Sequence, residues 1–233
     1  MKKIIISATA ISLLILSGCS NSNSNNGNNS GQEQTKTKKE ENNLATNIAK
    51  EYKTIVEKGK DNFTQVTLPE NKTYKLDYTL THINEDNIPE LIVRLHDGEG
   101  REYNKIYSYN GENNSIIENK DLVMSGVFPV GGFRAVLDAS KEKNGLYKNG
   151  GYSGTGEFEV HKIILENYKF SEKVIYKYKM GVNNPDTNDY EKIKFVPIDN
   201  KESLVKLAKT PIKKVSIAEI NNIKIENPKN RGD

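Results

Sequence analysis

The stretch THINEDNIPELIV, residues 81–93, joins a polar loop directly to an apolar strand. Asn84 and Asp86 stand at alternate positions of the loop, and Glu90 comes just before the apolar residues. Asn and Asp favour tight turns because their side chains bond to nearby backbone and tolerate the left-handed conformation. The stretch therefore predicts either a metal-binding loop or a hairpin turn at the start of a strand.

A calcium loop presents oxygen ligands at alternate positions, with a backbone carbonyl at the seventh. Counted from His82, Asn84 and Asp86 are third and fifth, the Ile88 carbonyl is seventh and Glu90 is ninth. The stretch resembles the D-x-N-x-D-G-x-x-E-L loop of many Gram-positive surface lipoproteins and calcium-binding repeats. It departs from that pattern at the first ligand, where an imidazole replaces an oxygen. We therefore predict a turn, with weak calcium binding through these four residues as the alternative and no other cofactor.

Alternation of apolar and polar residues predicts a series of β-strands. Tyr74–Leu80 is a half-buried strand and Leu91–Leu95 its partner, and Tyr103, Tyr107 and Tyr109 share one face of a third. Further strands are expected at 115–124, 133–138, 156–165 and 173–180. The turn residues between them favour antiparallel meanders over βαβ crossovers.

Helices are expected at both ends of this series. Leu44, Ile48, Tyr52, Ile55 and Val56 recur at helical spacing, and the following Gly59 suits a C-terminal cap. Residues 201–209 predict a short helix, and the capping box at 216–219 predicts another. The predicted fold is α+β, with an N-terminal helix packed on a mainly antiparallel sheet.

The N-terminus has the pattern of an export signal. Lys2 and Lys3 precede an apolar run at 4–16 that is shorter than the ~20 residues a spanning helix needs. The sequence Leu16-Ser17-Gly18-Cys19 follows, and it resembles the lipobox of bacterial lipoproteins. The resemblance implies cleavage before Cys19 and a diacylglyceryl group on its thiol, which anchors the protein to the outer face of the cytoplasmic membrane, exposed to the cell wall. Cys19 is the single cysteine, so no intramolecular disulfide can form.

Four segments follow from these patterns: a signal peptide at 1–18, a tether at 19–43, one domain at 44–228 and a frayed tail at 229–233. Residues 20–43 contain no apolar side chain, so we expect a flexible tether. Its Asn/Ser-rich composition resembles that of lipoproteins from low-GC Gram-positive bacteria.

Net charge gives no support to a nucleic-acid partner. The chain has 34 basic and 31 acidic residues, and loss of Lys2 and Lys3 with the signal leaves a charge of about +1. Residues 82–121 hold nine acids against four Lys/Arg, and residues 192–233 hold ten Lys/Arg against five acids. Solvated strand faces explain this distribution. The alternative is a local field that attracts a cation to the first region and anions to the second.

Catalytic motifs are incomplete. The stretch GYSGTG at 151–156 lacks the second glycine of a nucleophile elbow, and no histidines have metal-ligand spacing. A cluster of tyrosines at 103, 107, 109, 147 and 152 offers a ligand-binding face, with cross-strand packing as the simpler explanation. The terminal Arg-Gly-Asp at 231–233 resembles the integrin-recognition tripeptide, and we attribute it to chance.

These patterns predict a membrane-anchored, extracytoplasmic module that binds an unidentified envelope or extracellular partner without catalysis. The alternative is an envelope hydrolase using a carboxylate pair near Glu90 and Asp97. A transporter's solute-binding lipoprotein is disfavoured, because alternating βα units are absent.

Overall fold

The computed structural model describes residues 30–68 and 72–213. A long helix, α1 (Ser30–Lys58), leads through the 3-10 turn η1 (Gly59–Phe63) into the sheet. The strands are β1 (Lys75–Thr81), β2 (Glu90–His96), β3 (Arg101–Asn110), β4 (Ser115–Glu118), β5 (Val123–Phe128), β6 (Phe133–Ser140), β7 (Leu146–Tyr152), β8 (Glu157–Glu166), β9 (Lys169–Lys179), β10 (Tyr190–Lys192) and β11 (Val196–Pro197). A second 3-10 turn, η2 (Val130–Gly132), precedes β6, and a short helix, α2 (Glu202–Lys209), follows β11.

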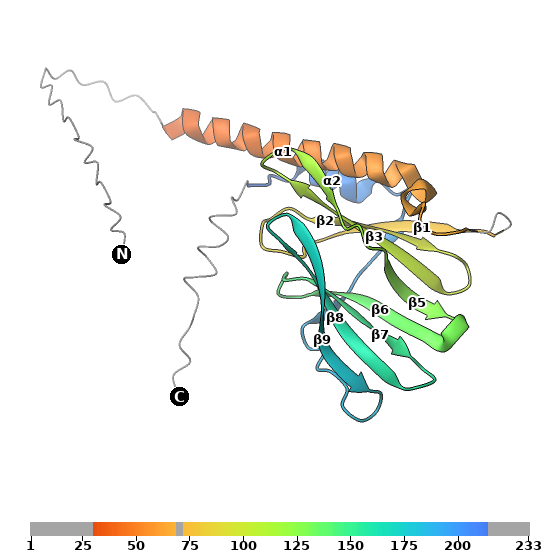
Figure 1. The fold of residues 1–233 in the computed structure, drawn as a ribbon. Helices are drawn as coiled ribbons and strands as arrows, with labels where there is room; N and C mark the ends of the chain where they lie inside the picture. Colours follow the sequence, from red (N-terminus) through yellow and green to blue (C-terminus); the bar gives the residue numbers. More distant parts are fainter. Residues whose placement is uncertain (1–29, 69–71, 214–233) are drawn as a thin grey trace, which may run out of the picture.

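All strand pairs are antiparallel, in the order β11-β1-β2-β3-β5-β6-β7-β8-β9. Two strands change neighbours along their length. The first half of β3 pairs with β5 and its second half with β4, while β6 pairs with both β5 and β10. The sheet therefore divides into two halves, which Figure 1 shows one above the other.

Two apolar clusters hold these layers together. The first lies between α1, α2 and one face of β1–β3, and the second joins the opposite face of β2 and β3 to β6, β7 and β8. On β2, Leu91, Val93 and Leu95 belong to the first cluster and Ile92 to the second. Because this part of β2 is buried on both faces, residues 91–93 form a continuous apolar run rather than an alternating one. The α+β fold predicted from the sequence is confirmed.

The apolar face predicted for the first helix is also confirmed, since Leu44, Ile48, Tyr52, Ile55 and Val56 are all buried. Gly59 has a φ of 55°, and the α-helix ends one residue before it. The helix begins at Ser30, however, within the segment expected to be a flexible tether. Gln, Glu and Lys are good helix formers, so a helix stabilised by packing beyond Leu44 extends through them.

Other boundaries differ from the prediction as well. The expected strand at 115–124 is two strands, β4 and β5, and β7, β10 and β11 were not predicted. The stretch that forms β7 contains Gly150 and Gly151, and glycine is common in turns, so its sequence favours a turn over a strand. At Gly151 a Cβ atom would lie 2.1 Å from the carbonyl oxygen of Glu157, so only glycine permits the close approach of β8. The predicted helix at 201–209 is confirmed as α2, and the one predicted from Ser216 lies outside the described residues.

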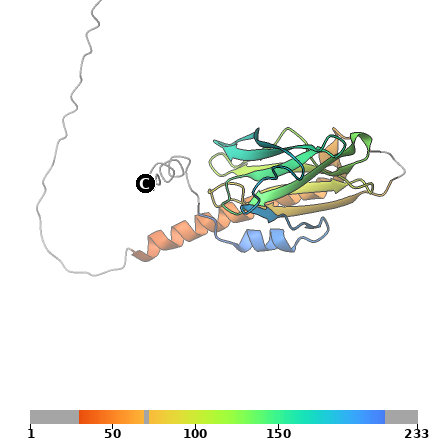
Figure 2. The same ribbon diagram turned by 90° about the horizontal axis from the view of Figure 1, so that it is seen from below.

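Figures 1 and 2 show the first turns of α1 projecting beyond the sheet. No helix among residues 30–68 and 72–213 has the length and apolar character needed to cross a membrane. The predicted signal peptide and Cys19 lie outside these ranges.

Candidate functional site

The loop between β1 and β2, residues 82–89, is held by hydrogen bonds to its own side chains. The Asp86 N–H donates to Asn84 Oδ1 at 3.2 Å, and the Ile88 N–H donates to Asp86 Oδ1 at 2.8 Å. Asn84 Nδ2 donates to Asp86 Oδ2 at 3.0 Å. Asn87 has a φ of 65°, the left-handed conformation predicted from its residue type.

Glu90 closes this loop from the first position of β2, and its side chain is fully buried. Its Oε2 accepts the Ile83 N–H at 2.8 Å, and its Oε1 accepts the Ser108 hydroxyl at 3.2 Å. The Tyr52 hydroxyl donates to the Pro89 carbonyl at 2.8 Å. The loop is therefore tied both to β3 and to α1.

Burial dominates the electrostatics of the two carboxyl groups. It raises the pKa of Glu90 well above the ordinary value, and the charge of Asp86 adds to this, against the hydrogen bonds from Ile83 and Ser108. Burial also raises the pKa of Asp86, against hydrogen bonds from Ile88 and Asn84. In the described part of the chain neither carboxylate makes an ion pair with a cationic side chain.

The structure brings the four predicted calcium ligands into one loop, but their carboxylate and amide oxygens accept hydrogen bonds from the loop and from Ser108. Within residues 30–68 and 72–213, no three His, Cys, Asp or Glu side chains converge in a metal-binding group. The loop thus satisfies its own polar groups, as the turn prediction requires. Calcium binding stays a prediction.

The carboxylate pair of the hydrolase alternative is not brought together. Glu90 begins β2 and Asp97 follows its last residue, so about 23 Å of extended chain separates them. Burial acts to raise the pKa of Asp97, but hydrogen bonds from Glu99 and Arg101 lower it below the ordinary value. Asp97 thus stabilises the β2–β3 turn.

The other motifs have structural roles. Ser153 lies in the exposed turn between β7 and β8, where its hydroxyl donates to the Gly132 carbonyl at 2.9 Å. Tyr107, Tyr109 and Tyr147 are buried, which agrees with the packing explanation of the tyrosine cluster, and Tyr152 is exposed. The Arg-Gly-Asp tripeptide lies outside the described residues.

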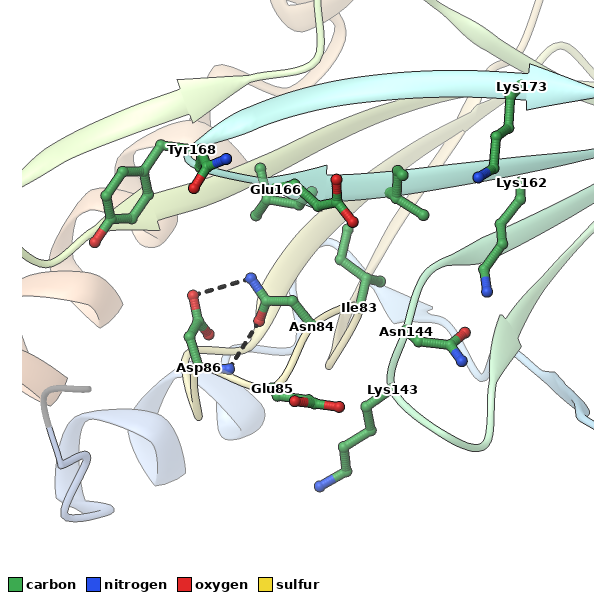
Figure 3. A pocket seen from close by; sticks show the side chains of 13 residues that line it. Ile83, Asn84, Glu85, Asp86, Lys143, Asn144, Lys162, Glu166, Tyr168 and Lys173 are labelled. Atoms are coloured by element: carbon green, nitrogen blue, oxygen red, sulfur yellow. Dashed lines mark hydrogen bonds between the residues drawn. The ribbon is translucent and has the colours of Figure 1, made fainter. Parts of the chain in front are cut away.

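A cavity of about 390 Å³ lies where three segments meet: the 82–89 loop, the turn between β6 and β7, and the β8–β9 hairpin. We call it the hairpin pocket (Figure 3). It is lined by Ile83, Asn84, Glu85, Asp86, Lys143, Asn144, Lys162, Ile164, Leu165, Glu166, Asn167, Tyr168 and Lys173. Its size falls within the range of small-molecule sites.

Several residues of the hairpin pocket have unusual backbone conformations. Among the residues that the structure describes, five other than glycine have positive φ, and three of these line the pocket: Lys143, Asn167 and Tyr168. Asn167 and Tyr168 form the two-residue turn of the β8–β9 hairpin, where φ is positive at both positions. For lysine and tyrosine this conformation costs free energy. Such strain is typical of functional sites.

Three lysines line the hairpin pocket together with three carboxyl groups, those of Glu85, Asp86 and Glu166. Lys162 on β8 and Lys173 on β9 are paired across the two strands, and Lys143 comes from the β6–β7 turn. Burial lowers the pKa of Lys162, against the attraction of Asp189, and the charge of Lys173 lowers it further. No carboxylate of the described residues lies within 4.0 Å of these three ammonium groups.

A buried acceptor also lines the hairpin pocket. Asn144 donates through Nδ2 to Glu142 at 3.0 Å, while its Oδ1 is buried and accepts no hydrogen bond. A buried polar atom without a partner costs free energy.

No protein-family model, curated protein sequence or solved structure matches this chain. The sequence analysis found Asn84 and Asp86, which line the hairpin pocket, but missed the three lysines. They are spread over 31 residues, from 143 to 173, and no local pattern connects them. Only the pairing of β6, β7, β8 and β9 brings them to one cavity.

The raised pKa of Glu90 gives a prediction for the pH dependence of stability. In the folded protein the Glu90 carboxyl keeps its proton to a higher pH than in the unfolded chain, where its pKa has the ordinary value of 4.5. The stability that Glu90 contributes is therefore lost as the pH rises from 4.5 through the pKa of the folded state. Glutamine can still accept the Ile83 N–H and can donate to Ser108, but it does not titrate. In buffer with EDTA, Glu90→Gln should raise the free energy of unfolding at pH 7.5 by roughly 1–2 kcal/mol.

This gain should shrink as the pH approaches 4, in urea unfolding followed by circular dichroism. The matched control is Glu191→Gln, at an exposed position of β10. This variant should have the same pH profile of stability as the wild-type protein. A Glu90→Gln protein that is less stable than wild type at pH 7.5 would contradict the buried-carboxyl account.

Proposed function

We propose that this protein is a lipid-anchored, extracytoplasmic binding protein without catalytic activity, and that the hairpin pocket is its ligand site. The observation that carries the proposal is the pocket itself. It combines a cavity of ligand size, strained backbone at Lys143 and Tyr168, and three lysines that form no salt bridge within the described residues. In a protein selected for stability alone, each of these features is a cost.

The proposed anchor is Cys19, through the lipobox at residues 16–19. Two acyl chains hold a protein on a membrane stably, where one binds only marginally. The first turns of α1, which project beyond the sheet, then act as a stiff spacer between the lipid and the domain (Figure 2). The membrane and an envelope or extracellular ligand are thus the proposed partners, with no nucleic acid among them.

The hydrogen bonding of the carboxylates favours a binding function over hydrolysis. The oxygens of Asp86 and Glu90 accept hydrogen bonds from backbone and side chains, so they are not placed to transfer protons. The hydrolase alternative would have to draw on Glu85 and Glu166, which line the pocket but are exposed.

The anchor can be tested in the cell. Replacement of the lipid-bearing cysteine, Cys19→Ser, should abolish metabolic labelling with a palmitate analogue and remove the protein from the detergent-soluble membrane fraction. The matched control is Ser20→Ala, at the next residue, which should stay labelled. Labelling that persists in Cys19→Ser would refute the proposed anchor.

Ligand binding can be tested by NMR titration of the purified protein with hydroxylated probes: glycerol, glucose, N-acetylglucosamine and glucose 6-phosphate. We expect amide resonances from the 82–89 loop, the β6–β7 turn and the β8–β9 hairpin to shift together, with the probe recovered unchanged. If no probe shifts these resonances, the hairpin pocket is not the ligand site. Cleavage of a wall polymer, lost in Glu166→Gln, would favour the hydrolase instead.

A further inference from the structure

We infer that the ligand of the hairpin pocket carries an oxyanion, a phosphate or a carboxylate, on a hydroxylated body such as a sugar or polyol. The inference rests on the proposed binding function and adds the chemical class of the ligand. It follows from how the charges of the pocket are arranged.

The first step is the pairing of Lys162 and Lys173. Their Cα atoms are partners in the β8–β9 register, and Figure 3 shows both side chains on the same side of the pocket. Like charges directly opposite on neighbouring strands destabilise a sheet. A bound oxyanion would offset this repulsion, because it attracts both ammonium groups at once.

The second step is a contrast on the same strands. Away from the pocket, Lys177 on β9 pairs with Glu159 on β8, and Lys148 on β7 pairs with Glu172 on β9. A carboxylate thus neutralises each of these two lysines. Lys162 and Lys173, by contrast, form no salt bridge within the described residues, and the Lys162 ammonium lies 5.4 Å from the centroid of the Tyr147 ring.

The third step is Lys143, which approaches from the β6–β7 turn with a φ of 53°. A lysine rarely takes this left-handed conformation, whereas glycine or asparagine would do so at lower cost. Its charge acts on the neighbouring His82, whose pKa is lowered first by burial and then by Lys143. The turn thus adds a third positive charge to the wall of the pocket.

The fourth step is the hydrogen-bonding character of the remaining wall. Asn84, Glu85 and Glu166 supply acceptors there. In Figure 3 Asn84 and Glu166 lie across the pocket from the Lys162 ammonium. Hydroxyl groups donate to such acceptors, so a hydroxylated body fits this side while the oxyanion meets the lysines.

The test is isothermal titration calorimetry at 50 mM salt with four probes: glucose 6-phosphate, glucuronate, glucose and glycerol. The two anionic probes should bind at least tenfold more tightly than the two neutral ones, and raising the salt to 500 mM should weaken their binding. Tighter binding of glucose 6-phosphate than of glucuronate would identify phosphate as the anion, and the reverse order a carboxylate.

The substitutions Lys162→Gln and Lys173→Gln should each weaken the binding of the anionic probes at least tenfold. Lys179→Gln is the matched control, because Lys179 lies on the same strand but outside the pocket, and it should bind as the wild-type protein does. Without ligand, Lys173→Gln should melt at the same temperature as wild type or higher, because a repulsion has been removed. A lysine with only a structural role would lower the melting temperature.

Equal binding of glucose and glucose 6-phosphate, unaffected by Lys173→Gln, would overturn the inference while the proposed binding function stands. Failure of all four probes to bind would overturn the inference for this class of ligand. In that case the NMR titration with N-acetylglucosamine tests separately whether the pocket is a ligand site.

Discussion

The burial of β2 on both faces is the constraint on which the rest of the structure depends. Leu91, Val93 and Leu95 face the helices, and Ile92 faces the folded-back half of the sheet. A slip of one residue in the pairing of β2 would exchange the two faces and place the wrong side chains in both clusters. The strand must therefore begin at one defined residue, Glu90.

The 82–89 loop sets that residue. Its turn is closed by Asn84 and Asp86, and the buried carboxyl of Glu90 binds the Ile83 N–H and the Ser108 hydroxyl. Burying a carboxyl without a cationic partner costs free energy, which the raised pKa reflects. The same loop forms one wall of the hairpin pocket, so the element that fixes the central strand also positions Asn84 at the proposed ligand site.

The sequence predicted those parts of the fold that depend on local periodicity. The buried face of α1, the strands β1, β2 and β3, and the turn at 84–87 follow from the spacing of apolar and turn residues. The start of α1 was missed because its first residues lack apolar side chains, and β7 because Gly150 and Gly151 resemble a turn. The doubling-back of the sheet was not predictable, since it arises where β3 and β6 change partners. For the same reason Lys143, Lys162 and Lys173 showed no pattern before the strands were paired.

Because the oxygens of Asn84 and Asp86 in the 82–89 loop accept hydrogen bonds from the loop itself, we predict that the turn forms without a metal. Thermal unfolding of the purified protein in EDTA and in 5 mM calcium tests this most directly. An ion that binds only the folded state raises its stability by about 2.7 kcal/mol at a concentration of 100 Kd. The account predicts the same midpoint in both buffers. A midpoint raised by calcium in the wild-type protein but not in Asp86→Ala would contradict it and make the loop a working calcium site.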